Sequence, residues 1–312
     1  MDISVIIVTR NTCAVTMEAI ESVLQSKDTL HKEIIVVDNG SSDESTREIP
    51  RRYPSIKFDA AGSNLGFAKA NNRGAAHASG DLLLLLNSDA RLQPDALTKA
   101  VDFLRRHPEC GVAGAQLLNA DSSLQNSIAN FPTTATELLN KSVLRRLWPK
   151  RYPGKERAFT SPTEVESIVG AFLLTPKAVW DKLGGLDERY FFFLEETDYC
   201  LQVQRMGMKV MHLPHVLVWH GQGQTAKKTH IPARIEYWRS RYIYFQKNAA
   251  KIDTLLLRAG LLVRLLANLL TNGIATLVTL GRAKKPRSKS SEQAALFLWH
   301  LQGCPKTAGL PR

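Results

Sequence analysis

Residues 80–91 have the sequence Gly-Asp-Leu-Leu-Leu-Leu-Leu-Asn-Ser-Asp-Ala-Arg, and this stretch decides the fold. Its consecutive leucines are too few for a typical helix and too apolar for a strand with one face in water. Such a run is typical of a central strand in a parallel sheet, which is buried on both faces. The run stops at Asn87, Ser88 and Asp89. Polar groups therefore follow the carboxyl end of a core strand, the edge where open α/β sheets bind ligands.

Asp89 and Asn87 form a candidate cation site. They lie two residues apart, so both side chains leave the strand on the same side. A carboxylate there can hold a divalent cation, which in turn holds a diphosphate. The alternative is a strand-to-helix turn in which Asp89 is a helix cap. That alternative explains the following Pro94-Asp95 well and the run Asn-Ser-Asp less well, so this stretch alone supports the two interpretations equally.

The composition limits the class of protein. With 312 residues, of which 44% are hydrophobic, the chain can form one large domain or a domain with appendages. Its formal net charge of +12 indicates an anionic partner: nucleic acid, anionic lipid or a phosphorylated small molecule. The four cysteines are scattered, which argues against a zinc site or a disulfide framework and fits a reducing cytosol. No signal peptide is expected at the amino terminus, so chemistry is expected on the cytoplasmic side.

Strand-like and helix-like segments alternate in the amino-terminal half. Strands are expected at residues 4–9, 34–37 and 56–58, before the leucine run, and an alanine-rich helix at 64–74. Asp43 is expected to cap the helix after the second strand. This alternation predicts parallel βαβ units with right-handed crossovers, and therefore an α/β fold.

The ends of these strands carry polar residues. No Gly-x-Gly-x-x-Gly follows the first strand, which argues against a dinucleotide-binding fold. The second strand ends in Asp38, whose carboxylate can accept a hydrogen bond from a uracil or thymine N–H or from a ribose hydroxyl. Taken alone, Asp38-Asn39-Gly40 is better explained as a tight turn. However, polar residues also occur at Thr9, at 64–66 and at 87–89, each after or beside an expected strand. The occurrence of all four together favours a nucleotide site.

The motifs at these strand ends resemble those of family 2 glycosyltransferases, and most closely their rhamnosyltransferase-like members. The resemblance covers residues 3 to about 225 and is specific because several motifs match in order. It implies a GT-A fold with a mainly parallel central sheet, a nucleotide-diphosphate sugar donor, inversion at the anomeric carbon, and Mg²⁺ or Mn²⁺ as cofactor. The matching motifs are Val-Ile-Ile-Val-Thr-Arg-Asn (5–11), Val-Val-Asp-Asn-Gly-Ser-Ser-Asp (36–43), Asn-Leu-Gly-Phe-Ala-Lys-Ala-Asn-Asn (64–72) and Leu-Leu-Asn-Ser-Asp-Ala (85–90).

The resemblance also implies a set of donor-binding residues. One position departs from the family pattern, because Asn87 stands where many relatives carry Asp. Asn is a neutral and weaker metal ligand, so Asp89 is expected to carry most of the cation binding. The expected donor-binding residues are Thr9, Asn11, Asp38, Asn64, Gly66, Asn71, Asn87, Ser88 and Asp89.

The acceptor side is less clearly signalled. Residues 116–165 are interpreted as an excursion over the site that helps to form the acceptor pocket, and a plain surface insertion is equally supported. A strand is expected at residues 165–174. Gly170 and Ala171 interrupt it, as happens where a ligand or another backbone comes close, and they are expected to contact the acceptor.

Three acidic residues follow an aromatic run at residues 191–193 and begin a helix. Carboxylates are stabilised at a helix amino terminus, and inverting transfer needs a base to deprotonate the acceptor hydroxyl. By position in the family motif, Glu196 is the expected base and Glu195 its rival. Asp198 is expected on the acceptor side, where it fixes the helix start or a neighbouring backbone amide. Relatives often carry Arg where this chain has Gln202. The alternative is that these acids only stabilise the helix.

His220 is the remaining expected metal ligand. Strands are expected at residues 210–213 and 216–220, and family members place a metal-binding His after such a strand. His220 would then complete a site with Asp89 and Asn87. Without this context, a lone His at a strand end is better explained as structural. The segment 222–228 is expected to be a basic loop that closes on diphosphate, or else a solvated loop.

The carboxyl-terminal part from residue 231 differs in character. Arginines alternate with aromatic residues up to position 247, a leucine-rich stretch covers 254–281, and basic residues gather at 282–289. These features favour helices that lie on an anionic cytoplasmic leaflet rather than cross it. A helical hairpin packed on the catalytic domain and a homodimer interface are the alternatives. Residues 303–312 are expected to be disordered.

Together these features predict a catalytic domain at residues 1–230, divided into a nucleotide-sugar half (1–115) and an acceptor half (116–230), and a membrane-associated helical region at 231–302. The expected function is transfer of a hexose, best assigned as L-rhamnose from dTDP-rhamnose, to a polyprenyl-linked or polysaccharide acceptor for the cell envelope. Another donor sugar and a non-catalytic binding protein are the alternatives. Nucleic-acid binding ranks last, because the basic residues are not accompanied by a recognisable nucleic-acid-binding motif.

Overall fold

The computed structural model describes residues 1–149, 151–152, 158–221, 230–278 and 284–312. By their contacts, the residues form two compact units. The sheet unit contains residues 1–131 and 155–222 together with Arg312, and the helical unit contains residues 132–154 and 223–311. Residues 132–154 lie inside the range expected for the catalytic domain, yet they group with the carboxyl-terminal helices. The domain boundaries at 115, 230 and 302 stay predictions.

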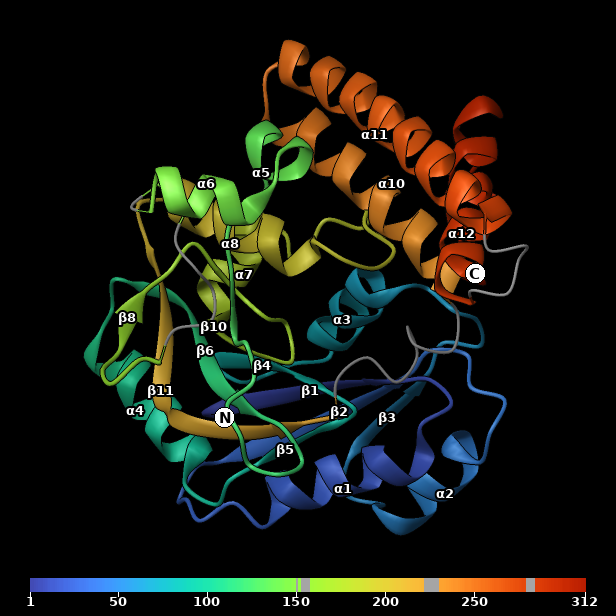
Figure 1. The fold of residues 1–312 in the computed structure, drawn as a ribbon. Coiled ribbons are helices and arrows are strands. Elements are labelled where there is room, and N and C mark those ends of the chain that lie inside the picture. The colour runs from blue at the N-terminus through green and yellow to red at the C-terminus, as the bar shows by residue number, and fades with distance from the viewer. Residues whose placement is uncertain (150, 153–157, 222–229, 279–283) are drawn as a thin grey trace. The chain divides into compact units, whose positions relative to one another are not determined.

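A mixed, mostly parallel sheet is the core of the sheet unit (Figure 1). Within the described residues it has nine strands, ordered β3-β2-β1-β4-β10-β6-β11-β5, with β8 beside β11. Neighbours among β1–β4 are parallel, β10 is antiparallel to β4 and β6, and β11 is parallel to β6. The expected α/β class is therefore confirmed. The strands are β1 (Ile3–Thr9), β2 (Lys32–Asp38), β3 (Lys57–Ala60), β4 (Leu82–Asn87), β5 (Ala90–Leu92), β6 (Cys110–Leu118), β8 (Thr163–Glu164), β10 (Phe172–Pro176) and β11 (Lys209–His220), while β7 (Ile128–Ala129) pairs with β9 (Ser167–Ile168).

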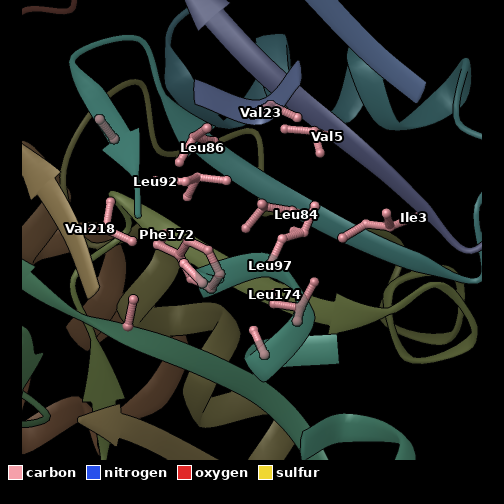
Figure 2. Close-up of a cluster of buried hydrophobic side chains, with 14 of the residues drawn as sticks. Ile3, Val5, Val23, Leu84, Leu86, Leu92, Leu97, Phe172, Leu174 and Val218 are labelled. Atoms are coloured by element: carbon pink, nitrogen blue, oxygen red, sulfur yellow. The ribbon is translucent and has the colours of Figure 1, made fainter. Parts of the chain in front are cut away.

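The leucine strand β4 is buried on both faces, as the sequence predicts. Leu84 and Leu86 join one apolar cluster, in which Figure 2 shows them with Phe172 of β10. Leu83 and Leu85 join the cluster on the other face. All four leucines are at most 2% exposed. At about 1.5–3 kcal/mol for each fully buried leucine, this strand is a main source of the unit's stability.

Helices cover both faces of the sheet (Figure 1). Helices α1 (Cys13–Leu24), α2 (Ser45–Arg52) and α4 (Ala96–Arg106) contribute side chains to one apolar cluster. Helices α3 (Phe67–Ala76), α7 (Lys177–Leu183) and α8 (Glu195–Arg205) contribute to the other. This three-layer arrangement brings the carboxyl ends of β1, β2 and β4 to a single edge.

Some local predictions need correction. Glu44, and not Asp43, is the N-cap residue of α2, while Asp43 accepts hydrogen bonds from the amides of Cys13 and Ser45. The two strands expected at residues 210–213 and 216–220 are one strand, β11, whose pairing with β6 shifts register between Leu213 and Leu217. The shift spans Pro214, which has no N–H for the ladder, so an irregularity replaces the expected break.

Among its described residues, the helical unit has two short helices and three long ones. In α11, Leu257, Leu261 and Leu265 recur every four residues and are buried, and α11 packs against α5, α10 and α12. Glu137 of α5 is 4% exposed, its carboxylate lies 2.7 Å from Arg241, and its carbonyl accepts a hydrogen bond from Arg264. The helices are α5 (Thr134–Leu138), α6 (Lys141–Leu147), α10 (His230–Asn248), α11 (Lys251–Val278) and α12 (Lys284–Leu301).

The carboxyl-terminal tail lies against α10 within this unit. The Arg239 guanidinium donates to the carbonyl oxygens of Pro305 and Ala308. Trp299 also donates to the Pro305 carbonyl, at 3.2 Å. The disorder expected for residues 303–312 stays a prediction.

His212 of β11 makes stability sensitive to acid. The side chain is fully buried, its ring lies 4.7 Å from Phe159, and neither ring nitrogen has a hydrogen-bond partner among the described residues. Burial lowers the pKa of His212 from 6.5 to about 4. The unfolded chain therefore takes up the proton first, and the free energy of unfolding should fall by roughly 3 kcal/mol between these two pH values.

Replacing His212 by Leu should flatten this acid slope, because the variant has no group to protonate at the site. Chemical denaturation of both proteins between pH 7 and pH 4 measures the difference. His215→Leu is the matched control, since His215 is exposed on the same strand and its removal should leave the slope unchanged. Equal slopes for wild type and His212→Leu would contradict the assignment.

Candidate functional site

Asp38 has an unused acceptor at the end of β2. The residue is 1% exposed, and its Oδ1 accepts a hydrogen bond from the Ser41 amide at 3.0 Å. Its Oδ2 is buried and has no hydrogen-bond partner among the described residues. A buried acceptor without a donor costs about 1–3 kcal/mol. A ligand N–H or O–H at this position would remove that cost.

Asn11 joins the loops that follow β1 and β2. Its backbone is left-handed, with a φ of 55°, a conformation that Asn tolerates better than most residues. Its Oδ1 accepts hydrogen bonds from the amides of Ser42 and Asp43, at 2.6 and 3.3 Å. Its own amide donates to Ser41 Oγ at 3.0 Å. Asn11 therefore shapes the loop that carries the Asp38 site.

Asn39 is a site residue that the sequence did not single out. Its Nδ2 donates to Asn64 Oδ1 at 3.0 Å and to the Gly66 carbonyl at 3.3 Å, and its Oδ1 accepts from the Leu65 amide at 2.7 Å. These bonds hold the loop at residues 64–66 beside the end of β2. The sequence Asp38-Asn39-Gly40 by itself predicts a tight turn. A turn does not predict that the Asn39 side chain bonds to a loop 25 residues further along the chain.

Thr9 and Asn71 lie inside the fold. Thr9 is fully buried, and its hydroxyl lies 2.8 Å from the hydroxyl of Thr16. Asn71 is 1% exposed and donates to the Phe67 carbonyl one turn earlier in α3. Contact of either side chain with a donor stays a prediction.

The ends of β4 and β11 meet at the candidate metal site. His220 Nε2 lies 3.4 Å from Asp89 Oδ1 and 3.3 Å from Asn87 Nδ2. The Gly221 amide donates to the Asp89 carbonyl at 2.9 Å, which fixes the turn against the end of β11. The described residues contain no cluster of three or more His, Cys, Asp and Glu side chains that could hold a metal ion. The arrangement instead provides one carboxylate, one imidazole and one amide, a mixed set suited to Mg²⁺ or Mn²⁺ with donor oxygens completing the coordination.

Ser88 and Ala171 connect this site to its surroundings. Ser88 Oγ accepts a hydrogen bond from the Thr12 hydroxyl at 3.3 Å, next to α1. The Asn87 amide donates to the Ala171 carbonyl at 3.1 Å. The single strand expected at residues 165–174 is instead two strands in different sheets, β9 and β10, and Gly170 and Ala171 lie in the gap between them. The structure thus brings the expected acceptor segment beside the end of β4.

The acidic residues begin α8 after a strained turn. Phe193 and Leu194 both have left-handed backbones, with φ of 75° and 69°, and such values in bulky residues mark local strain. Glu195 is 5% exposed, whereas Glu196 is partly exposed. A Cβ added at Gly170 would lie 3.4 Å from the Cβ and Cγ atoms of Glu196. Glu196 therefore lies directly against Gly170, close to the strand end that carries Asn87.

Asp198 is 2% exposed in the first turn of α8. The Gln202 side-chain amide lies 3.5 Å from its Oδ1. The expected basic loop at 222–228 lies outside the described residues.

The fold of this chain also occurs in solved structures of other proteins. Solved structures that share it include a mannosyltransferase from Pyrobaculum calidifontis in complex with GDP-Man and Mn²⁺, with a TM-score of 0.55, 16% identity and coverage of 98% of this chain and 87% of that one. S. aureus TarS (residues 1–349) in complex with UDP has a TM-score of 0.55, 14% identity and coverage of 97% and 92%. The chain therefore has the GT-A fold.

The family follows from the sequence comparison. The model of glycosyl transferase family 2 matches residues 4–184, which is more than half of the chain. The protein belongs to this family and is a glycosyltransferase. One relative is the N-acetylglucosaminyl-diphospho-decaprenol L-rhamnosyltransferase of Mycobacterium tuberculosis, 26% identical over 68% of this chain and 73% of its own length. Another is the rhamnosyltransferase WbbL of Escherichia coli, 23% identical over 72% and 88%.

Gly66 provides a test of the contact between the two loops of the site. Its φ is +83°, and an added Cβ would lie 2.5 Å from the Phe191 carbonyl oxygen, which already accepts a hydrogen bond from the Phe67 amide. Gly66→Ala should therefore lower the free energy of unfolding by about 1–3 kcal/mol beyond the cost of the left-handed backbone. Activity should also fall, because the displaced segment leads into α8.

Gly62→Ala is the matched control for this substitution. Gly62 has a φ of +75° with open space around its Cβ position, so Ala there should cost only the backbone strain, about 1 kcal/mol. Urea denaturation and initial transfer rates of the two variants are compared. The difference between them separates the cost of the left-handed backbone from the cost of the steric clash with Phe191. Equal losses in the two variants would show that the contact with Phe191 is unimportant.

Proposed function

We propose that this enzyme transfers L-rhamnose, with inversion, from dTDP-rhamnose to a lipid-linked or polysaccharide acceptor. The names of the relatives support the sugar and the lipid-linked acceptor. The observation that carries the site assignment is the meeting of Asp89 and His220 at 3.4 Å, from strand ends more than a hundred residues apart in sequence.

Asp38 is the residue proposed to recognise the nucleobase of the sugar donor. Its buried, unused Oδ2 would accept a hydrogen bond from the ring N–H of thymine or uracil. Cytosine has no N–H at that ring position, so the carboxylate would favour a thymidine or uridine nucleotide. Asn11, Asn64 and Gly66 form the surrounding loops and would contact the sugar of the nucleoside or its phosphates.

Asp89, His220 and Asn87 would hold Mg²⁺ or Mn²⁺ beside the donor diphosphate. The residues fit such a cation because a carboxylate, an imidazole and an amide converge there while leaving coordination positions for phosphate oxygens. When bound, the cation offsets the charge that develops on the departing diphosphate. Ser88 lies in the same turn and would contact the diphosphate.

Glu196 is the proposed base, with Glu195 as its rival. Glu196 lies against Gly170 and is the more exposed of the two acids, so it is better placed to reach an acceptor. In the proposed step it takes the acceptor hydroxyl proton while the acceptor oxygen bonds to the anomeric carbon. The bond from that carbon to the diphosphate oxygen breaks, and its electron pair leaves with the nucleoside diphosphate.

The outer face of α11 is the proposed contact with an anionic cytoplasmic leaflet. The segment Lys251–Ala275 is long and apolar enough to cross a membrane by length and composition. However, one face of α11 packs within the helical unit, where Arg264 donates to the Glu137 carbonyl and Arg258 lies over the Tyr242 ring. These contacts support a helix that lies in the interface. Among the side chains of α11 whose burial is described, the large exposed apolar ones are Ile252, Leu255, Leu256, Val263, Leu266, Leu270, Ile274 and Val278.

Two substitutions test the catalytic assignment. Asp89→Ala should abolish transfer and weaken donor binding in the presence of Mn²⁺, because it removes the charged cation ligand. Glu196→Gln should reduce turnover by about 10²–10⁴-fold, since it removes the base, while the Kd for the donor stays unchanged. Transfer rates and calorimetric donor titrations measure both effects. Near-wild-type turnover in both variants would overturn the proposal, and donor binding without any wild-type turnover would favour a non-catalytic binding protein.

The membrane contact can be tested with vesicles. Val263→Glu combined with Leu270→Glu should reduce sedimentation with vesicles that contain phosphatidylglycerol, because charge is introduced into the inserted face. Leu24→Glu is the control, since Leu24 of α1 is a comparably exposed apolar residue of the sheet unit. Sedimentation unaffected by the double substitution would refute the contact. A concentration-dependent dimer that the double substitution dissociates would instead assign this face to a homodimer.

A further inference from the structure

Gln125 contacts the ring of His220 from the side opposite the candidate metal site. The side chain of Gln125 is buried, and its Oε1 lies 2.7 Å from His220 Nδ1. Gln125 follows β6 and lies 95 residues from His220 in sequence. None of the motifs at the strand ends includes it.

The orientation of the Gln125 amide follows from its other contacts. Its Nε2 lies 3.3 Å from the main-chain carbonyl oxygen of His220 and 3.0 Å from Asn119 Oδ1. A main-chain carbonyl can only accept a hydrogen bond, so the amide nitrogen must face it. The opposite end of the amide, the oxygen Oε1, then faces the imidazole ring.

This orientation decides which ring nitrogen of His220 carries the proton. Oε1 has no hydrogen, so the 2.7 Å contact requires a proton on Nδ1. A neutral imidazole has one such proton, and Nε2 therefore keeps its lone pair. Nε2 is the nitrogen that lies near Asp89 and Asn87. The lone pair thus points to the place proposed for the cation.

The backbone of Gln125 is also held in place. Its amide donates to the Leu117 carbonyl at 2.8 Å, and its carbonyl accepts from Gln116 Nε2 at 2.9 Å. These bonds tie Gln125 to β6, the strand that pairs with β11. The side chain and the ring that it contacts are thus held by two neighbouring strands.

We propose that Gln125 is a positioning residue that keeps His220 in the Nδ1–H tautomer and turns Nε2 toward the cation. The part of this inference that concerns a cation rests on the proposed function, while the tautomer itself does not. Partners of this kind raise the basicity of a ligating His and fix its ring, and their loss typically weakens metal binding about 10–100-fold. Without Gln125, Asp89 would be the acceptor left beside the ring, which favours a proton on Nε2, where the cation must bind.

The tautomer can be measured on the metal-free protein. Long-range ¹H–¹⁵N correlation spectra of ¹⁵N-histidine-labelled protein distinguish the two ring nitrogens, and His220→Asn assigns the signal. Wild type and Gln125→Glu, which keeps an acceptor oxygen, should show the Nδ1–H tautomer. Gln125→Leu should shift His220 to Nε2–H. An Nε2–H tautomer in the wild-type protein overturns the proposal, even if Gln125→Leu does not fold.

Metal affinity is measured separately by titration with Mn²⁺ and electron paramagnetic resonance of the free ion. Gln125→Leu should weaken Mn²⁺ binding about 10–100-fold, and Gln125→Glu should restore most of it. Gln204→Leu is the control, because the Gln204 amide donates to the carbonyls of Val165 and Glu166, and it should leave the affinity unchanged. Equal affinities for wild type and Gln125→Leu overturn the proposal. Absence of Mn²⁺ binding in a wild-type protein with the Nδ1–H tautomer overturns the cation site and the role of Gln125 toward it.

Discussion

Burial of β4 on both faces is the constraint on which the site depends. A strand that is apolar on both sides must lie in the middle of a sheet with helices above and below. β4 accordingly lies between β1, which is parallel to it, and β10, which is antiparallel. Because the leucines end at Asn87, the change from apolar to polar residues coincides with the edge of the sheet. Packing in the core therefore determines where the polar residues are exposed.

The directions of the neighbouring strands bring the remaining groups to the same edge. Since β10 runs antiparallel to β4, its amino end meets the carboxyl end of β4, and Ala171 lies beside Asn87. β11 runs in the same direction as β6, so its carboxyl end delivers His220 to this edge as well. Gly170 then connects the edge to Glu196. The directions of the strands thus bring groups that are far apart in sequence to the same edge of the sheet.

Sequence alone was informative where a pattern is local. The length, apolar character and abrupt end of the leucine run predicted β4 and the position of Asp89 after it. The alternation of strand-like and helix-like segments predicted the α/β class, with Asp38 at the end of a strand. The pairing of His220 with Asp89 required the family resemblance, because a lone His after a strand carries little information. Asn39 and Gln125 were missed because they act through side-chain bonds to distant segments, which leave no periodic signal. The association of residues 132–154 with the carboxyl-terminal helices was missed for the same reason: Glu137 finds Arg241 and Arg264 only in three dimensions.

The central claim is that the strand ends bind a thymidine- or uridine-diphosphate sugar through a cation. The most direct measurement is a thermal-shift comparison of dTDP-rhamnose, UDP-sugars and GDP-mannose, each with and without Mn²⁺. A ligand that binds only the folded state raises the midpoint of unfolding. The account predicts a Mn²⁺-dependent rise with dTDP-rhamnose that exceeds the rise with GDP-mannose. A well-folded protein whose midpoint responds to none of these donors would contradict it.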